Sequence, residues 1–280
     1  MISNSFLDNG NGFNDIIDFN SRTVTLKRFD LDSKRTYSTI SSDAATATAT
    51  PVNNTQESFN EGSKSDANTL GALKEWAIVC NALESGNQIL SFRKGGIMEF
   101  RNGFELKFRN FFLSPTFEHQ DKESIRMDYY AALDELNRKN GLNNAEALHD
   151  SNKITEITSF VEITHFSEMP DLNTLKKLEN FHIWTDDYLK SRFDYNPKKP
   201  LYLLLLRTYK LNNPIRLMNK PEWAGCKSWI QINSHDPDLI TYFENHLPEK
   251  PFEYLKSISK PCIDDDNFNN LSEKVRSIIK

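Results

Sequence analysis

Two hydrophobic patterns alternate along the chain. Phe104, Leu106 and Phe108 are separated by charged residues, a period of two that predicts a strand with one solvated face. Over residues 123–140 the apolar positions instead follow a helical period and form one stripe. Residues 200–211 contain a run of four leucines, which predicts a strand that is buried on both faces and central in its sheet.

The other apolar segments beyond residue 70 predict a mixture of strands and helices. Apolar runs on either side of a Ser-Gly-Asn turn, 73–83 and 88–93, are typical of a β-hairpin. Further strands are expected over 154–166 and 228–232, and helices over 172–178, 186–193, 236–246 and 272–279, with a Pro-rich loop at 248–251. Thr185 is placed to cap the 186–193 helix. Because no βαβ rhythm is present, we expect an α+β fold with a mainly antiparallel sheet, or a partly open barrel, and flanking helices.

The first 69 residues have a different composition. They are dense in Asn, Ser, Thr and Asp and contain an alternating Ala-Thr run, so they offer little apolar surface to offset the entropy of ordering. We therefore expect a disordered, low-complexity tail over 1–69, a single α+β domain over 70–260, and a C-terminal helix or tail over 261–280. Any protein partner is expected to bind through the N-terminal tail.

Composition restricts the class of protein. The mean hydropathy is −0.60, and the longest apolar run is far shorter than the ~20 residues that span a bilayer. The N-terminus has no basic region followed by an apolar one, so no secretory signal is predicted. Three widely spaced cysteines argue for a reducing compartment and against a disulfide framework. We expect an intracellular protein, cytoplasmic or nuclear, that does not enter a membrane and is not secreted.

The charge is unevenly distributed. The whole chain has a net charge of −5, whereas residues 185–230 hold nine Lys and Arg against four Asp and Glu. The overall acidity argues against indiscriminate nucleic-acid binding, but the basic segment suits a ligand that carries phosphate. A solvated basic face is the alternative interpretation.

A polar triplet follows a predicted strand end. Glu118, His119 and Gln120 come just after Pro115, where an apolar run gives way to a loop, and rigidly held loops are where function concentrates. On a continuing strand only Glu118 and Gln120 would share a face, so a turn after Pro115 is needed to bring all three together. We expect this segment to orient a ligand or to lock a turn.

Six short blocks, taken in their order, resemble the uncharacterised family named domain of unknown function 1802. The blocks are Ala-Leu-Lys-Glu-Trp-Ala at 72–77, Arg-Lys-Gly-Gly-Ile at 93–97, Pro-Thr-Phe-Glu-His-Gln at 115–120, His-Ile-Trp-Thr at 182–185, Pro-Leu-Tyr-Leu-Leu-Leu-Leu-Arg-Thr-Tyr at 200–209 and Gly-Cys-Lys-Ser-Trp at 225–229. The likeness covers roughly residues 70–232. The family name implies no activity and no cofactor.

The opening of the domain also looks like that of Nudix hydrolases, and this likeness can be tested. Their catalytic helix holds Mg²⁺ with two carboxylates, and in the best register, 134–142, Arg138 and Lys139 occupy those positions. A hard divalent cation requires oxygen ligands, so Nudix chemistry by this helix is excluded.

Three hypotheses for function remain. The first is a recognition module for an anionic ligand, a nucleotide or nucleic acid, whose site gathers Arg93, Lys94, Glu118, His119, Gln120, His182, Trp184, Arg207 and Lys227. Arg and Lys would neutralise phosphate, Gln120 and His119 would read polar edges, and Trp184 could stack on a ring. The second is a hydrolase, with or without a metal, that uses Glu118 or His119 as acid or base, and the third is a non-catalytic interaction scaffold. The sequence identifies no cofactor and no set of metal ligands.

Overall fold

In the computed structural model, the chain divides into two units, Met1–Ser58 and Phe59–Lys280. The structure describes residues 69–94, 104–139 and 154–280 in full, and three strands of the first unit by their backbone. Those strands, β1 (Phe6–Asp8), β2 (Phe13–Asn20) and β3 (Thr23–Asp30), form an antiparallel sheet in the order β1-β2-β3. The rest of the predicted tail lies outside the described residues, so its disorder stays a prediction.

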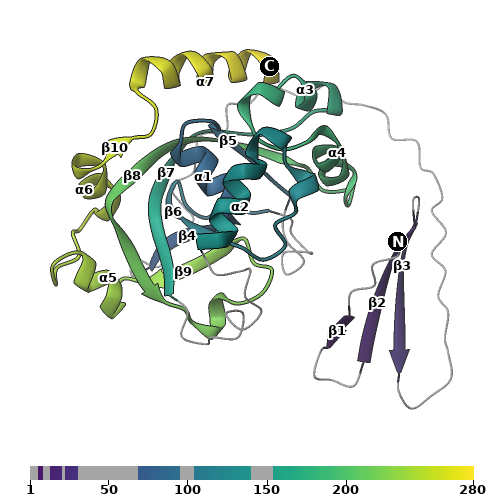
Figure 1. Ribbon diagram of the computed structural model, residues 1–280, viewed down its shortest axis with the longest axis horizontal. Coiled ribbons are helices and arrows are strands. Elements are labelled where there is room, and N and C mark those ends of the chain that lie inside the picture. The colour runs from purple at the N-terminus through teal and green to yellow at the C-terminus, as the bar shows by residue number, and fades with distance from the viewer. Residues whose placement is uncertain (1–5, 9–12, 21–22, 31–68, 95–103, 140–153) are drawn as a thin grey trace. The chain divides into compact units, whose positions relative to one another are not determined.

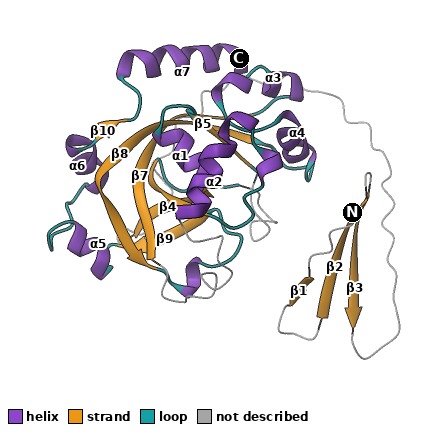
Figure 2. Ribbon diagram, in the orientation of Figure 1, coloured by secondary structure: helices purple, strands orange, loops and turns teal. Residues whose placement is uncertain are grey.

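The second unit is built on a curled, half-barrel sheet of seven strands (Figures 1 and 2). The strands are β4 (Thr69–Trp76), β5 (Leu90–Arg93), β6 (Asn110–Thr116), β7 (Ile154–Glu168), β8 (Tyr202–Met218), β9 (Trp229–Asn233) and β10 (Lys260–Pro261). Their order is β10-β8-β7-β6-β4-β9, and β5 pairs with β8. The pair β4–β6 is parallel and the other described pairs are antiparallel, which confirms the α+β prediction of a mainly antiparallel, partly open barrel with flanking helices.

Helices flank this sheet in the described part of the unit. They are α1 (Ala77–Glu84), α2 (Tyr130–Lys139), α3 (Leu172–Lys176), α4 (Asp186–Asp194), α5 (Pro237–Tyr242), α6 (Pro251–Ile258) and α7 (Asp265–Ile279). Thr185 caps α4 as predicted, because its hydroxyl accepts a hydrogen bond from the backbone N–H of Tyr188 at 3.3 Å. The expected Pro-rich loop at 248–251 in fact leads into α6, with Pro251 at a first-turn position where proline is tolerated.

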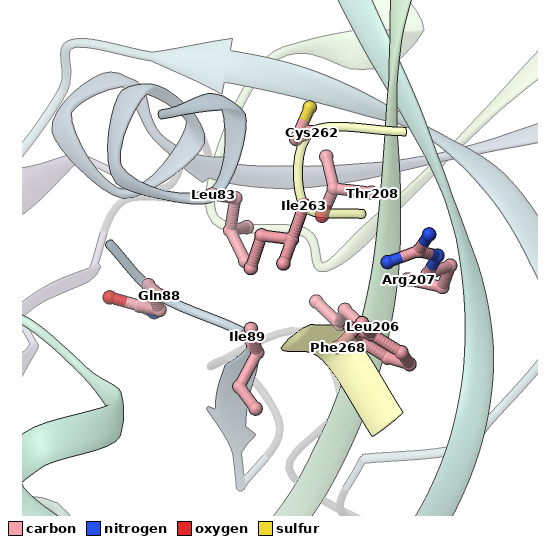
Figure 3. A pocket seen from close by; sticks show the side chains of 9 residues that line it. All are labelled: Leu83, Gln88, Ile89, Leu206, Arg207, Thr208, Cys262, Ile263 and Phe268. Carbon is pink, nitrogen blue, oxygen red and sulfur yellow. The ribbon is translucent and has the colours of Figure 1, made fainter. Parts of the chain in front are cut away.

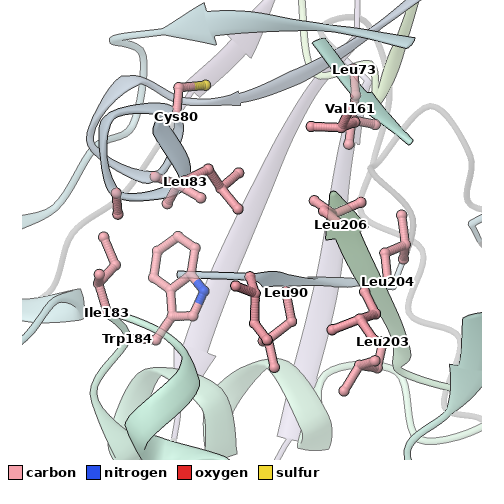
Figure 4. Close-up of a cluster of buried hydrophobic side chains, with 14 of the residues drawn as sticks. Leu73, Cys80, Leu83, Leu90, Val161, Ile183, Trp184, Leu203, Leu204 and Leu206 are labelled. Atoms are coloured by element: carbon pink, nitrogen blue, oxygen red, sulfur yellow. The ribbon is translucent and has the colours of Figure 1, made fainter. Parts of the chain in front are cut away.

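The sheet buries both faces, and each face has its own core. One core joins α1, α2, α3, α4 and α7 to the strands, and the other lies under α5 and α6. Successive side chains of β6 point to opposite faces of the sheet. Phe111 and Leu113 therefore face the first core, and Phe112 between them faces the second. Figure 4 shows the first core, where Leu83 of α1 and Leu90 of β5 lie near leucines of β8. Leu203 to Leu206 are all buried, as predicted for a central strand.

The hairpin expected over 73–93 is wrong. β4 ends at Trp76, the apolar run that follows forms the buried helix α1, and β5 pairs with β8 instead of β4. Almost every residue of α1 is buried because the helix lies inside the curl of the sheet. A short run that is apolar throughout shows no period, so a buried helix and a buried strand look alike in sequence.

The strand expected over 104–108 is also not observed. These residues lie outside the ladders, and β6 begins only at Asn110. Their alternation still predicts which side chains face the core, because Phe104 is buried and Glu105 is exposed. The Phe108 ring lies over Gly71 of β4, where an added Cβ would come within 2.3 Å of it, so a side chain there would collide with the ring.

A candidate ligand-binding cleft

The ladder between β4 and β9 ends at Leu73, and beyond it side chains bridge a gap between β4 and β5. The Glu75 carboxylate of β4 accepts hydrogen bonds at Oε2 from the Ser91 hydroxyl, at 2.9 Å, and from Arg93 Nη1, at 3.2 Å. Arg93 Nη2 also donates to the Lys74 carbonyl at 3.1 Å. Ser91 and Arg93 lie on β5, so this polar clip joins two strands that do not pair with each other in the sheet.

A cleft of about 380 Å³ lies at this gap. Its lining residues are Lys74, Glu75, Trp76, Phe92, Arg93, Lys94, Thr116, Glu118, His119, Trp184, Tyr188, Leu189, Arg192, Gly225, Cys226, Lys227 and Ser228. Five of them are Lys or Arg and two are Glu, so the described lining is cationic. The volume falls within the ~300–1,000 Å³ typical of small-molecule sites.

Arg93 is held in place on the floor of the cleft. Its side chain is 14% exposed and that of Glu75 is 7% exposed, so the ion pair is largely desolvated. The buried Phe104 ring lies 5.7 Å from the guanidinium carbon and restricts the guanidinium further. Two of the five N–H groups of a guanidinium serve the clip, which leaves others for a ligand.

Lys94 and Arg192 bring two further cations to one side of the cleft. Lys94 Nζ donates to the Phe193 carbonyl, and its position beside α4 places it near Arg192. Burial, together with the Arg192 guanidinium, lowers the pKa of the Lys94 amine below its ordinary value. A bound anion would relieve this repulsion between like charges.

A tight turn supplies the opposite side. Gly225 has a φ of +82°, a left-handed conformation that favours glycine, and its carbonyl accepts a hydrogen bond from Lys74 Nζ at 3.0 Å. Lys227 donates through Nζ to the Glu222 carbonyl at 2.5 Å. The turn therefore holds Lys227 and the exposed Cys226 at the cleft, far along the chain from β4.

Aromatic rings form one wall. Trp184 stacks on Tyr188 with ring centroids 4.7 Å apart, and Trp76 meets the Trp184 ring edge-on at 5.0 Å. Trp184 is only 5% exposed, so it supports the wall, whereas the half-buried Trp76 presents more of its ring. Burial also raises the pKa of the Tyr188 hydroxyl.

The polar triplet after Pro115 forms a turn, and its members separate. Glu118 and His119 are exposed at the rim of the cleft, and His119 adopts a left-handed φ of 62°. Gln120 turns inward: its Oε1 accepts a hydrogen bond from the Ile78 N–H at 2.9 Å, in the first turn of α1. The side chain of Gln120 therefore satisfies a helix end and does not line the cleft.

His182 lies behind the cleft. It is fully buried, its Nδ1 accepts a hydrogen bond from the Trp184 N–H at 3.2 Å, and its ring meets Phe92 edge-on at 5.6 Å. Burial, with a smaller contribution from the Arg126 charge, lowers the pKa of His182 to about 3. The ring is therefore neutral at physiological pH and does not line the cleft.

Arg207 lies in a separate seam between β8 and α7 (Figure 3). Its guanidinium pairs with Asp265 at 2.6 Å, and its carbon lies 4.5 Å from the centroid of the Phe268 ring. The surrounding side chains leave no volume for a water molecule. This arginine fixes α7 to the sheet, and it does not line the cleft.

Of the predicted site residues, six line one cleft and three do not. Those in the lining are Arg93, Lys94, Glu118, His119, Trp184 and Lys227. Sequence reasoning missed Glu75 as well as the lining residues Lys74, Trp76 and Arg192. A carboxylate inside an apolar strand was the available signal for Glu75, because a buried charge needs a partner.

Two features are absent from the described residues. Among residues 69–94, 104–139 and 154–280, no group of three or more His, Cys, Asp or Glu could hold a metal ion. None of the helices in the described part of the chain is long and apolar enough to cross a bilayer.

Comparison with known proteins gives a family and a distant likeness. The model of the family described as "Domain of unknown function (DUF1802)" matches residues 72–241. No curated protein matches the chain. Among solved structures, two mutant forms of ZmASCH from Zymomonas mobilis are similar at 12% identity, with TM-scores of 0.32 and 0.31. Each match covers 68% of this chain and 96% or 98% of the other.

Proposed function

The chain belongs to the family of the domain of unknown function 1802, a description that states no activity, and from its cleft we propose a recognition module for a nucleoside phosphate. The ligand is a mononucleotide or a nucleotide unit of single-stranded nucleic acid. Both present the same chemistry, a planar base joined to a phosphate, and the experiment below separates them.

One observation carries this proposal: five Lys and Arg residues line one cleft, against two Glu among its described lining residues, and one of these carboxylates already pairs with Arg93. Cations gathered in a partly desolvated cavity favour an anion, because they repel one another when no anion is bound. The lowered pKa of Lys94 beside Arg192 reflects its burial together with that repulsion. Arg and Lys are also the residues that contact phosphate oxygens most often.

The aromatic wall supports a ring on the same ligand. Trp76, braced by Trp184 and Tyr188, gives the cleft an apolar side beside its cations. A base stacked on an aromatic side chain contributes about 1–3 kcal/mol. A cleft that combines a ring surface with cations fits a nucleoside phosphate better than it fits an inorganic anion.

The test is a titration that follows intrinsic tryptophan fluorescence, because Trp76 lines the cleft. The probes are the four ribonucleoside monophosphates, adenosine without phosphate, a single-stranded hexauridylate and a matched RNA duplex. We expect saturable binding of a monophosphate or of the hexamer, with adenosine and the duplex weaker.

Matched variants locate the binding. Arg192→Gln removes a cleft cation and should weaken binding several-fold, whereas Arg216→Gln removes an exposed cation that pairs with Glu156 elsewhere and should leave binding unchanged. The proposal fails if no nucleoside phosphate binds at millimolar concentration, or if both variants weaken binding equally.

A further inference from the structure

We infer that Glu75 is a positioning residue: it fixes the Arg93 guanidinium so that the remaining N–H groups meet the phosphate of the ligand. This inference rests on the proposed function. Glu75 does not itself bind the phosphate, because a carboxylate and a phosphate repel each other, and its oxygens instead accept three hydrogen bonds from the protein. The donors are the Trp76 N–H, the Ser91 hydroxyl and Arg93 Nη1.

Geometry supports the assignment. A guanidinium is planar, so contacts with Glu75 Oε2 at 3.2 Å and with the Lys74 carbonyl at 3.1 Å fix both its position and its plane. The Phe104 ring restricts it further. A free arginine loses much rotamer entropy when it binds an anion, whereas Arg93 is already immobile in the folded protein.

The clip also explains how a buried carboxylate is tolerated in a cleft whose described lining is cationic overall. A charge as buried as that of Glu75 requires a partner and hydrogen bonds, and both are supplied from β5. Its charge offsets that of Arg93, so the anion meets a directed set of donors and not merely an additional positive charge. The other four cations provide the net attraction.

The experiment compares Glu75→Gln with the parent chain on adenosine 5′-monophosphate, adenosine and the single-stranded hexauridylate. The amide keeps the size and one acceptor oxygen but loses the charge that holds Arg93. We expect about tenfold weaker binding of the phosphate probes, with the affinity for adenosine unchanged. Because Arg93 keeps its charge, the salt dependence of hexamer binding should not change in slope.

Two controls make the result specific. Glu84→Gln changes a carboxylate of similar burial in α1, outside the cleft lining, and should leave binding unchanged. Glu75→Gln should also have no further effect in an Arg93→Lys background, because Glu75 acts through the guanidinium. If Glu75→Gln unfolds the chain, Ser91→Ala removes one hydrogen bond to the same oxygen and should give a smaller loss in the same direction.

The outcomes are distinguishable. If the parent chain binds none of the probes, the proposed function fails. If the parent binds while Glu75→Gln or, should that variant unfold, Ser91→Ala binds like the parent, only the role of Glu75 is overturned. Equal losses for adenosine and for the phosphate probes would overturn it as well, because they would show a general distortion of the cleft.

Discussion

Arg93 and Arg207 are both nearly buried, both pair with a carboxylate from another element, and both are predicted to bind an anion. Arg93 pairs with Glu75 across the gap between β4 and β5 and faces a cleft of about 380 Å³. Arg207 lies beside Phe268 in the seam under α7 (Figure 3). It pairs with Asp265, and the seam leaves no volume for water. The same residue type therefore recognises a ligand in one region, by our proposal, and fastens a helix in the other.

The two arginines differ in what lies on the side of the guanidinium that does not face its carboxylate partner. The Phe268 ring lies 4.5 Å from Arg207, and the acidic partner Asp265 is 87% exposed, so the charge is neutralised at the protein surface. For Arg93 the acidic partner is the buried member and the open side faces the cleft. Burial of an arginine thus indicates a function only when the cavity beside it is known.

The largest effect is expected from Arg93→Ala. Removal of one partner from a buried pair leaves Glu75 uncompensated and should lower the free energy of unfolding by about 3–5 kcal/mol. Binding of nucleoside phosphates should also be lost. Denaturant titration and fluorescence titration measure the two effects.

Adding Glu75→Gln to Arg93→Ala sharpens this test. The neutral amide needs no counterion, so part of the stability should return while binding stays lost. Recovery of binding in the double variant would show that Arg93 does not contact the ligand.

Arg207→Ala should act on stability alone. Loss of the desolvated contact with Phe268 predicts a decrease of about 2 kcal/mol in the free energy of unfolding, with ligand affinity unchanged. Arg207→Met, which keeps the apolar bulk, should recover part of that loss. A fall in ligand affinity in folded Arg207→Ala would break the contrast between the two regions.

His182 allows a test by pH. Its pKa is about 3 in the folded state and about 6.5 when the chain is unfolded, so between these values the unfolded chain binds the additional proton. The free energy of unfolding should therefore fall as the pH falls from about 6.5 towards 3. At pH 5 His182 alone should account for a loss of about 2 kcal/mol.

The measurement compares unfolding of the parent chain and of His182→Gln at pH 7 and pH 5. The variant should lose less stability on acidification, because glutamine does not titrate. Identical losses would show that the pKa of His182 is not lowered in the folded chain, contrary to its full burial.

The smallest effect is expected from Gln120→Ala. Its carbonyl oxygen caps the first turn of α1 through the Ile78 N–H, so stability should fall by about 1 kcal/mol. Ligand affinity should stay the same. If the variant keeps its stability but loses affinity, Gln120 contacts the polar edges of the ligand, as predicted from the sequence.

The sequence predicts those parts of the fold that local signals determine. The leucine run of β8 and the cap at Thr185 need no distant partner to be recognised. The run after Trp76 is apolar on all sides, so its helical form depends on the curl of the sheet around it. The period-two pattern that begins at Phe104 likewise predicts correctly which side chains are buried, but the segment does not pair with a strand of the sheet.

Prediction of the site reaches the same limit. Arg93, Lys94 and Lys227 are candidates because of their charge, and the structure brings them to one cleft. Glu75 remains hidden because its partners lie 16 and 18 residues away on a different strand. His182 and Arg207 carry the same chemical signals as true lining residues, and only their burial behind Phe92 or Phe268 separates them.

The parallel pair β4–β6 and the antiparallel pair β4–β9 have a consequence for how the protein is made. Lys74 N–H bonds the Ser228 carbonyl, and Lys74 Nζ reaches Gly225, 151 residues along the chain. At a synthesis rate of about 5–20 residues per second, on the order of ten seconds pass between the emergence of β4 and that of β9. During that interval a nascent chain exposes one unpaired edge of β4, so newly made protein is open to chaperones, and to misassembly, at the very strand that carries Glu75.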